Sequence, residues 1–586
     1  MTTAREAPLC SSCLRIFSSP TEPSSPTSVY CLRPRLAKAH HHSMVSLKQA
    51  VEVKCPICLA VATSLPPEPL SLSPDKSATS FNITKHENEF KISIFVNVNN
   101  STRPVFFNAA RVERVRGNRD NELQGMDLCH RWISDCLHFE DPEHHSSCRN
   151  HRTRSQTALR RPSHLIQLRR EGDDTQSSYT VCKYLPGREL SPDLPYATVS
   201  YPGWIDNPAT TGELVFENLG SWTSTSQLPV YLHQAAQIAF DAGVQYLWIP
   251  MFCANHAEDL ITTAHIFAGS AFNIAAMTCV KSSDPLLSSG ELSRMPIVRP
   301  RWDPEQALAI YRSDSFRDSV TDSSMWDSAL FYVEALLSPA TLYCGKDQIW
   351  WQCYHGRGAL CSETLAMTGS HCRTDDNQEG ILGQLEPSRL YTREYYKSYS
   401  NLDPRASVPF SESGSSNHVD LHGFESLHKC LAALWTWIIA TYSMTSTRTL
   451  EERVGVIDGI AKCVPLLATP GAADMFNSLS YAHGCWSADL VEQLSWHFAG
   501  DEVQDGEALP HRIDSTARFP TWSWLSLPGR VNFQFPIATH PGITSSTLLP
   551  NEIFLSPLAK ARFSTAEECN AIGVDAAGSK ALGEAT

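Results

Sequence analysis

The sequence has little charge, no excess of basic residues and no long hydrophobic run. Only 19% of its 586 residues are charged, and 48 Lys and Arg against 62 Asp and Glu give a net charge of 48 − 62 = −14. Nucleic-acid phosphates and anionic lipids are bound by clustered Lys and Arg, so this balance argues against a nucleic-acid or membrane-surface binder. The most apolar stretch, around Leu431 to Met444, is shorter than the ~20 residues that span a bilayer.

A secretory signal is also missing from the sequence. The chain begins MTTAREAPLC, without a basic segment followed by an apolar one. We therefore expect a cytoplasmic protein, in which the 19 cysteines are reduced thiols, buried small side chains or metal ligands rather than a disulfide framework. At roughly 100–200 residues per domain, the length predicts about three or four structural units.

Two C-x2-C pairs near the N-terminus form a candidate zinc site. Cys10 and Cys13 are separated from Cys55 and Cys58 by 55 − 13 − 1 = 41 residues, among them three histidines at 40–42. A C-x2-C turn can present two thiolates to one tetrahedral zinc ion, at about 2.3 Å each. Because compact zinc ribbons place only about 15–20 residues between such pairs, four unliganded thiols remain the alternative.

A second group combines cysteine and histidine as C-x8-H-x2-C, at Cys136, His145 and Cys148. A closed structural metal site would need a fourth ligand, for which Cys129 and His144 are nearby. Trp132 and Cys136 are four residues apart, which instead favours the buried face of a helix.

The periodicity of residues 185–277 predicts an α/β unit. Strands are expected at 196–201, 246–249 and 271–277, and helices at 228–242 and about 256–267. Strands that alternate with helices through short connections favour a parallel sheet with right-handed crossovers. Elsewhere we expect a strand at 90–98, a hairpin over 341–351, and helices at 427–438 and 449–463, the last stopping before Pro465.

A series of motifs lies in one order along almost the whole chain. In the centre these are Tyr196-Ala-Thr-Val-Ser-Tyr201, Tyr246-Leu-Trp-Ile249, Cys253, Ile266-Phe267 and Ile274-Ala-Ala276, followed by 334–342, 345–348, Trp351 and Cys353. Upstream are Trp132, Cys136, His145, Cys148 and Leu165-Ile166; downstream are Trp437–Tyr442, Asp458–Ala461 and Pro520-Thr-Trp-Ser-Trp524. This series resembles the fungal heterokaryon incompatibility (HET) domain, with Ser200, Tyr201, Trp248, Cys253, Trp522 and Trp524 as its motif residues.

The resemblance implies an α/β, parallel-sheet HET domain, similar by analogy to the TIR domain of innate immunity. We expect this domain at 185–340, after a partly disordered Cys/His-rich region at 1–150. A mixed α+β region at 341–564, with a long loop near 369–418, and a disordered tail at 565–586 would follow. The implied function is fungal non-self recognition and cell-death signalling through a protein partner or self-association.

An enzyme is the less favoured interpretation. Some TIR domains hydrolyse NAD, and such chemistry here would need a catalytic carboxylate, for which Glu334 and Asp259 are weak candidates. Cys253 could act as a nucleophile, but a buried packing role is favoured. The sequence departs from the family pattern at Pro202-Gly203, where a Cys-Trp-Gly-like turn is usual, and at Pro250, where Asp is usual. A degenerate paralogue that keeps the fold without activity is therefore a third interpretation.

Overall fold

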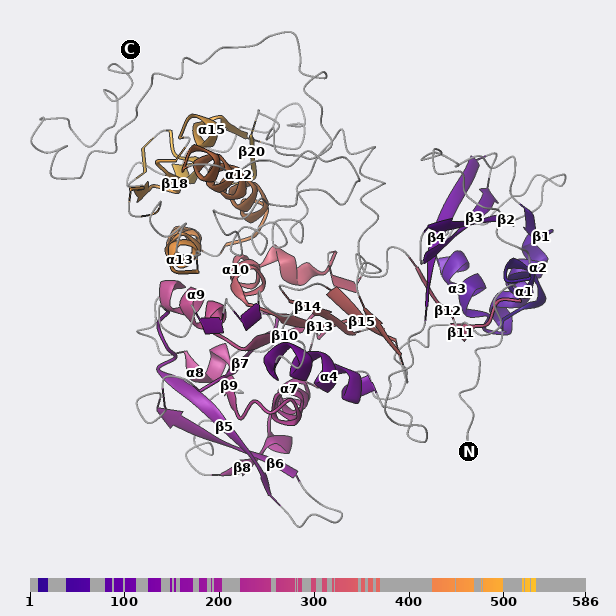
Figure 1. The fold of residues 1–586 in the computed structure, drawn as a ribbon, viewed down its shortest axis with the longest axis horizontal. Helices are drawn as coiled ribbons and strands as arrows, with labels where there is room; N and C mark the ends of the chain where they lie inside the picture. Colours follow the sequence, from indigo (N-terminus) through magenta and orange to yellow (C-terminus); the bar gives the residue numbers. More distant parts are fainter. Residues whose placement is uncertain are drawn as a thin grey trace, which may run out of the picture.

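The computed structural model is a mixed α/β protein with one six-stranded and one ten-stranded sheet (Figure 1). It describes residues 9–18, 38–63, 79–111, 125–138, 148–202, 222–368, 424–498 and 519–533, with short gaps inside the longer ranges. Within this part of the chain, no helix has both the length and the apolar character needed to cross a bilayer. The predicted loop near 369–418 and the tail at 565–586 lie outside the described residues.

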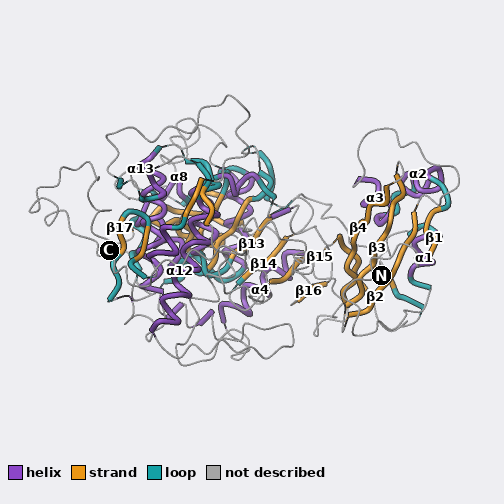
Figure 2. Tube along the Cα trace, turned by 90° about the horizontal axis from the view of Figure 1, so that it is seen from above, coloured by secondary structure: helices purple, strands orange, loops and turns teal. Residues whose placement is uncertain are grey.

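The six-stranded sheet has the order β1-β2-β3-β4-β12-β11. Its strands are β1 (Lys38–His41), β2 (Thr79–His86), β3 (Glu89–Val98), β4 (Ser101–Arg111), β11 (Ile297–Val298) and β12 (Leu308–Arg312). Three short helices share its core: α1 (Ser11–Ile16), α2 (Met44–Glu52) and α3 (Pro56–Thr63). Figures 1 and 2 show this group, here called the N-terminal unit, beside the rest of the protein. The strand predicted at 90–98 is confirmed as β3.

Two strands of the N-terminal unit come from much later in the sequence. β12 pairs antiparallel with β4, with Leu308 opposite Arg111, and β11 pairs with β12. The chain therefore enters this sheet twice, and the unit combines residues up to Arg111 with residues 297–312. This unit does not coincide with the predicted region 1–150. α4 (Gly125–His138) lies within that region but packs into the core of the large sheet.

The ten-stranded sheet has the order β16-β15-β14-β13-β10-β7-β9-β5-β6-β8. Its strands are β5 (His164–Glu171), β6 (Tyr179–Pro186), β7 (Ala197–Ser200), β8 (Thr223–Ser224), β9 (Tyr246–Trp248), β10 (Phe272–Ala276), β13 (Thr341–Cys344), β14 (Ile349–Gln352), β15 (Arg357–Cys361) and β16 (Leu365–Thr368). The four central strands, β13, β10, β7 and β9, run parallel. Antiparallel strands extend the sheet on both sides, so the whole sheet is mixed.

Four α-helices of the described residues connect the central strands: α7 (Val230–Asp241), α8 (Pro250–Cys253), α9 (Leu260–Ala268) and α10 (Ala329–Leu337). α7 and α9 confirm the helices predicted at 228–242 and about 256–267, whereas α8 and α10 were not predicted. α7 buries Leu232, Ala235 and Ala239 on one face. It ends before Gly243, whose φ of +80° is readily adopted only by glycine.

Alternate side chains of the central strands contribute to two cores. Val199, Ile274 and Leu342 pack on one face with residues of α4 and α7. Ala275 and Tyr343 pack on the other face with residues of α10, α12 (Phe424–Tyr442) and α13 (Leu450–Leu467). Figure 1 shows α12 and α13 on the opposite side of the sheet from α4 and α7. Such burial on both faces is typical of parallel strands.

The C-terminal region completes the second core. Its further elements are β17 (Tyr481–Ala482), β18 (Cys485–Trp486), α15 (Leu490–Leu494), β19 (Trp496–Phe498) and β20 (Val531–Phe533). The prediction that a helix ends before Pro465 is wrong, because α13 continues to Leu467. Pro465 lacks a backbone N–H, but two residues before the end of the helix this costs only one hydrogen bond. The buried side chains of Cys463 and Val464 stabilise this last turn.

Two glycines of α13 allow close contact with α9 and provide a stability test. A Cβ on Gly459 would lie 2.9 Å from the Ala264 Cβ and 3.2 Å from the Leu260 carbonyl oxygen, whereas one on Gly455 would lie 2.7 Å from the Leu260 Cδ1, the flexible end of that side chain, and 3.2 Å from its Cβ. Gly459→Ala should lower the free energy of unfolding by about 1–3 kcal/mol through overpacking. Gly455→Ala should lower it less, because the Leu260 Cδ1 can rotate away whereas the Ala264 Cβ and the Leu260 backbone cannot; the preference of the helix for alanine, about 1 kcal/mol, applies to both variants. Thermal unfolding compares the two variants, and equal losses would contradict this packing.

Candidate metal centre and motif residues

The four predicted zinc-ligand cysteines lie together in the N-terminal unit. Cys10 caps α1, its sulfur accepting the Cys13 N–H at 3.4 Å, and Cys13 lies in the first turn. Cys55 immediately precedes α3 and Cys58 lies in its first turn. Between α2 and α3 the chain turns at Lys54, whose φ of 58° lies in the left-handed region. Each C-x2-C pair therefore opens a short helix that directs both sulfurs toward the other pair.

The sulfur positions fit a single tetrahedral ion. The Cys58 sulfur lies 3.6 Å from that of Cys10 and 3.5 Å from that of Cys13, and the Cys13 and Cys55 sulfurs are 3.6 Å apart. All four sulfurs lie within 4.8 Å of one another. Two thiolates at about 2.3 Å from a tetrahedral zinc ion are about 3.8 Å apart, which is close to these distances. None of the described cysteines forms a disulfide.

Two histidines of the edge strand β1 also face the sulfurs. The Nε2 atom of His40 lies 3.3 Å from the Cys13 sulfur, and that of His41 lies 3.2 Å from the Cys58 sulfur and 3.8 Å from the Cys10 sulfur. The sequence placed these histidines between the cysteine pairs but did not identify them as part of the site. Only the pairing of β1 with β2 brings them there.

Hydroxyl groups hold both imidazole rings in place. The Thr79 Oγ1 accepts the His41 backbone N–H and lies 3.0 Å from His40 Nδ1. The Ser46 hydroxyl donates to the Ser43 carbonyl and lies 3.0 Å from His41 Nδ1. The Nε2 atom of each ring is thereby directed at the sulfurs, where an imidazole nitrogen can donate a hydrogen bond to a thiolate or offer a further donor atom to an ion.

The ionisation of this group depends on contacts between its sulfurs. Hydrogen bonds from Cys13, Cys55 and Cys58 hold the pKa of the Cys10 thiol far below its ordinary value of 9.0. The same contact with Cys10, together with burial, raises the pKa of Cys13 well above that value. Burial and the neighbouring His41 lower the pKa of His40 to about 3, which keeps this imidazole neutral. A divalent cation would replace the protons that the crowded thiols otherwise retain.

A buried polar network lies on the central strands of the large sheet. Asn273 of β10 donates to the Ser200 hydroxyl at 2.8 Å, and its Oδ1 accepts from Thr198 at 3.1 Å. Glu334 of α10 is 8% exposed and hydrogen-bonds Ser200. Burial raises the pKa of Glu334 to about 7, with the Ser200 contact acting in the opposite direction. A carboxyl with this pKa can exchange a proton near neutral pH, but the network lies between α10 and the sheet.

The other motif residues pack around the same strands. Trp248 is fully buried, with its ring centroid 5.4 Å from that of Phe267, and the Tyr201 ring lies 5.7 Å from that of Tyr231. The Cys253 sulfur is buried and accepts the Ile249 N–H at 3.5 Å. This local contact and full burial describe a packed thiol rather than an accessible nucleophile.

The remaining family positions fall outside this cluster or outside the described residues. Trp524 is fully buried in the second core, where the Trp496 indole donates to the Trp522 carbonyl at 2.7 Å. Pro250 stands at the start of α8, a position that needs no backbone donor, so the proline fits the local structure. Asp259 lies outside the described residues.

The second cysteine group has a different third member from the one that the sequence pattern predicts. Cys136 and Cys148 are brought together, and Cys353 joins them, each of the three sulfurs lying within 4.8 Å of the others. His144 and His145 lie outside the described residues. The pairing of Cys353 with the other two cysteines depends on the tertiary fold, so spacing in the sequence gave no signal for it.

Glu334→Gln tests whether the Glu334 carboxyl is protonated and neutral in the folded protein. Because its pKa is about 7 in the fold and about 4.5 in an unfolded chain, wild-type stability is full below pH 4.5 and is lost as the pH rises through 7. Between pH 5 and pH 8, wild type should therefore lose on the order of 3 kcal/mol relative to the variant. Unfolding at the two pH values measures this, with Glu451→Gln on the exposed surface of α13 as the control. A Glu334→Gln difference that stays constant with pH would contradict the assignment.

Comparisons of this chain with protein-family models, with curated proteins and with solved structures gave no match. The proposals below therefore depend on the chain's own residues and on their geometry.

Proposed function

We propose that this chain is a fungal heterokaryon incompatibility protein that acts in the cytoplasm in non-self recognition and cell-death signalling. The supporting observation is that motif residues far apart in the sequence pack around one set of parallel strands. Ser200 and Trp248 belong to β7 and β9, and Cys253 ends the adjoining helix α8. They are fully buried. Fully buried residues of this kind stabilise a fold and cannot touch a substrate. Their burial therefore supports signalling through protein contacts rather than catalysis at these positions.

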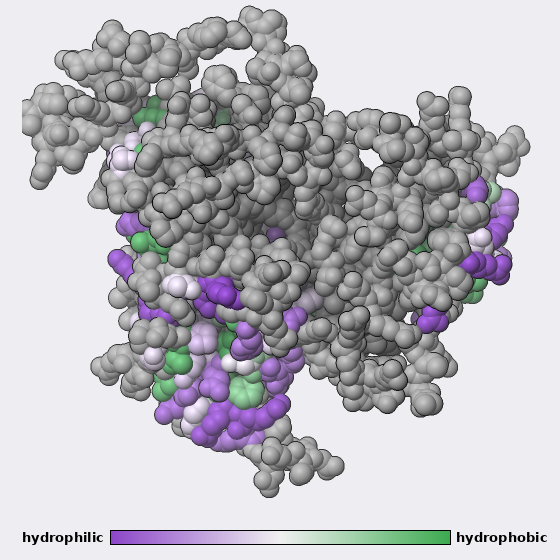
Figure 3. Space-filling view, in the orientation of Figure 1, coloured by the Kyte–Doolittle hydropathy of each residue, from purple (hydrophilic) through white to green (hydrophobic). Residues whose placement is uncertain are grey.

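A protein partner or a second copy of the chain would be bound at the surface of this fold. In Figure 3, the described surface over β5, β6 and β8 is largely hydrophilic, with small hydrophobic areas between the polar ones. Protein interfaces that form and dissociate have a similar mixture of polar and apolar area. The negative net charge favours protein partners over nucleic acid.

Zinc is the proposed cofactor of the N-terminal unit. Four sulfurs within 4.8 Å of one another and two imidazole nitrogens beside them, from His40 and His41, match the donors that zinc prefers. The ion would be structural, because it would join α1 to α3 and to the edge of the sheet. A small unit gains much of its stability from such a link.

Metal analysis of the full-length protein tests the zinc proposal. The triple variant Cys13→Ala/Cys55→Ala/Cys58→Ala should remove one zinc ion per chain and lower the thermal midpoint of the N-terminal unit, because it leaves a single sulfur beside the two imidazoles. His40→Ala should retain the ion with an affinity about 10–100-fold weaker, as expected when a partner of a ligand is removed. Equal zinc content in wild type and the triple variant would contradict the proposal.

Expression in a fungal host tests the signalling proposal. The full-length protein should arrest growth, and Glu334→Gln at the same expression level should arrest it too, because a signalling contact does not need this buried carboxyl to ionise. Absence of arrest by wild type in compatible hosts would count against signalling and in favour of a degenerate paralogue.

A TIR-like NAD glycohydrolase is the alternative that Glu334 supports, through its pKa of about 7 and its contact with Ser200 at the end of a parallel strand. In that case, the purified protein releases nicotinamide from NAD and Glu334→Gln abolishes both this release and the growth arrest. Arrest by both proteins without nicotinamide release excludes the hydrolase.

A further inference from the structure

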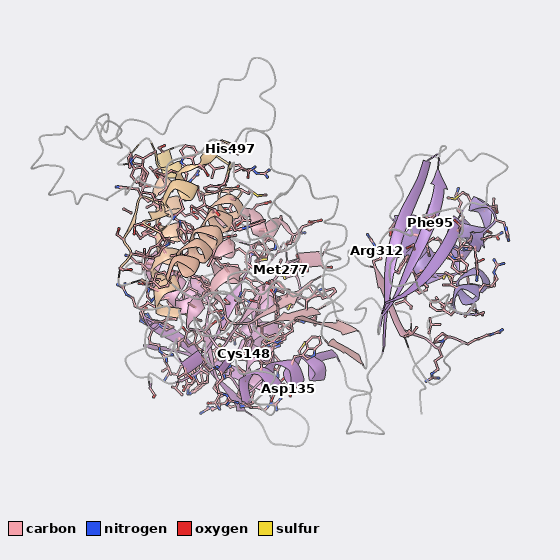
Figure 4. All side chains as sticks on the ribbon, turned by 45° about the horizontal axis from the view of Figure 1, so that its top comes forward. Phe95, Asp135, Cys148, Met277, Arg312 and His497 are labelled. Atoms are coloured by element: carbon pink, nitrogen blue, oxygen red, sulfur yellow. The ribbon has the colours of Figure 1, made fainter. Side chains whose placement is uncertain are left out.

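Three buried thiols meet in a core of the ten-stranded sheet, away from the zinc centre proposed above. Cys136 lies in the last turns of α4 and Cys353 directly follows β14. The side chains of Cys136, Cys148 and Cys353 are 2%, 4% and 5% exposed, and each sulfur lies within 4.8 Å of the other two. In Figure 4, Cys148 lies in the same part of the molecule as Asp135 of α4, whereas Phe95 and Arg312 mark the separate N-terminal unit.

The arrangement of these thiols goes beyond ordinary core packing. On α4, Cys129, Trp132, Ile133 and Cys136 are buried, so the helix periodicity explains why Cys136 faces inward. It does not explain why two cysteines from separate segments meet the same sulfur. A buried cysteine usually packs as a small hydrophobe against carbon. Three sulfurs within mutual reach instead form a set of ligands for a soft metal ion.

A basic side chain lies beside this thiol group. The Arg152 guanidinium donates to the carbonyl of Leu137, the residue after Cys136, at 2.8 Å, and it interacts electrostatically with Cys136 and Cys148. Three thiolates carry a charge of −3, which Zn2+ would reduce to −1 and Cu+ to −2, and the adjacent guanidinium offsets one further negative charge. Buried charge is tolerated when it is compensated in this way.

We propose that Cys136, Cys148 and Cys353 form a second metal site for a thiophilic d10 cation: Cu+, which three thiolates can coordinate completely, or Zn2+, whose fourth ligand would be a water molecule. Binding replaces three S–H bonds by three metal–sulfur bonds and releases three protons to solvent for each ion, with no change in oxidation state. The bound ion links α4 to the Cys148 segment and to the end of β14. It thereby fastens a peripheral helix to the central sheet.

The decisive experiment uses the full-length triple variant Cys13→Ala/Cys55→Ala/Cys58→Ala, in which the residues around the ten-stranded sheet are unchanged and the proposed N-terminal site is disabled. After treatment with a chelator, this protein is titrated with Zn2+ and, under anaerobic conditions, with Cu+. We expect one equivalent of at least one ion to bind, with about three protons released. No stoichiometric binding of either ion would overturn the proposal.

Matched variants then locate the ion. In the background of the triple variant, Cys353→Ala should lose the remaining equivalent, whereas Cys463→Ala, which removes a fully buried thiol of α13, should keep it. Retention of the ion by Cys353→Ala, or its loss from both variants, would contradict the assignment. Since the triple variant alone reports on the N-terminal centre, failure of the zinc proposal and failure of this one give different results.

Discussion

The structure depends on the burial of the central parallel strands on both faces. β7 and β10 lie in the middle of a ten-stranded sheet, with α4 and α7 on one face and α10, α12 and α13 on the other. Side chains that cannot reach water must satisfy their hydrogen bonds among themselves. Thr198, Ser200 and Asn273 do so, and Glu334 joins them from α10 as a group that is neutral over much of the acidic range. The burial that stabilises the sheet on both faces therefore also fixes the positions of Ser200 and Glu334, the polar residues of the motifs.

Local periodicity predicted the elements of this centre, but their partners depended on long-range pairing. The apolar spacing of 228–242 predicted α7 because it reflects one buried face of a helix. The short apolar run at 246–249 predicted β9 because it reflects a wholly buried strand. The addition of β11 and β12 to the N-terminal sheet has no local signature, since any two exposed strand edges can pair. The same limit applied to the sites. Each C-x2-C turn is visible in sequence, whereas His40, His41 and Cys353 reach their sulfur neighbours only through tertiary structure.

The proposed functions divide between the two sheets. The N-terminal unit gathers sulfur and imidazole donors where short helices meet an edge strand, an arrangement suited to a structural ion. The large sheet holds within its cores the residues on which the proposed HET resemblance rests, so the proposed recognition would use the surfaces that these residues support. A proline at the start of α8 shows how a departure from the family pattern can suit the fold while it removes a carboxylate.

The return of residues 297–312 to the N-terminal sheet gives the protein three chain crossings between its units instead of one. A single cut in any one of these connections would leave the units tethered by the other two. Removal of residues 1–111 would not release a self-contained remainder, because β12 would lose its long neighbour β4 and present an unpaired edge. The third crossing leads through the 3-10 turn Ser324–Asp327 to α10, the helix that carries Glu334. The last strand segment of the N-terminal unit and the helix that covers the central polar network are therefore consecutive elements of one chain, although they belong to different sheets.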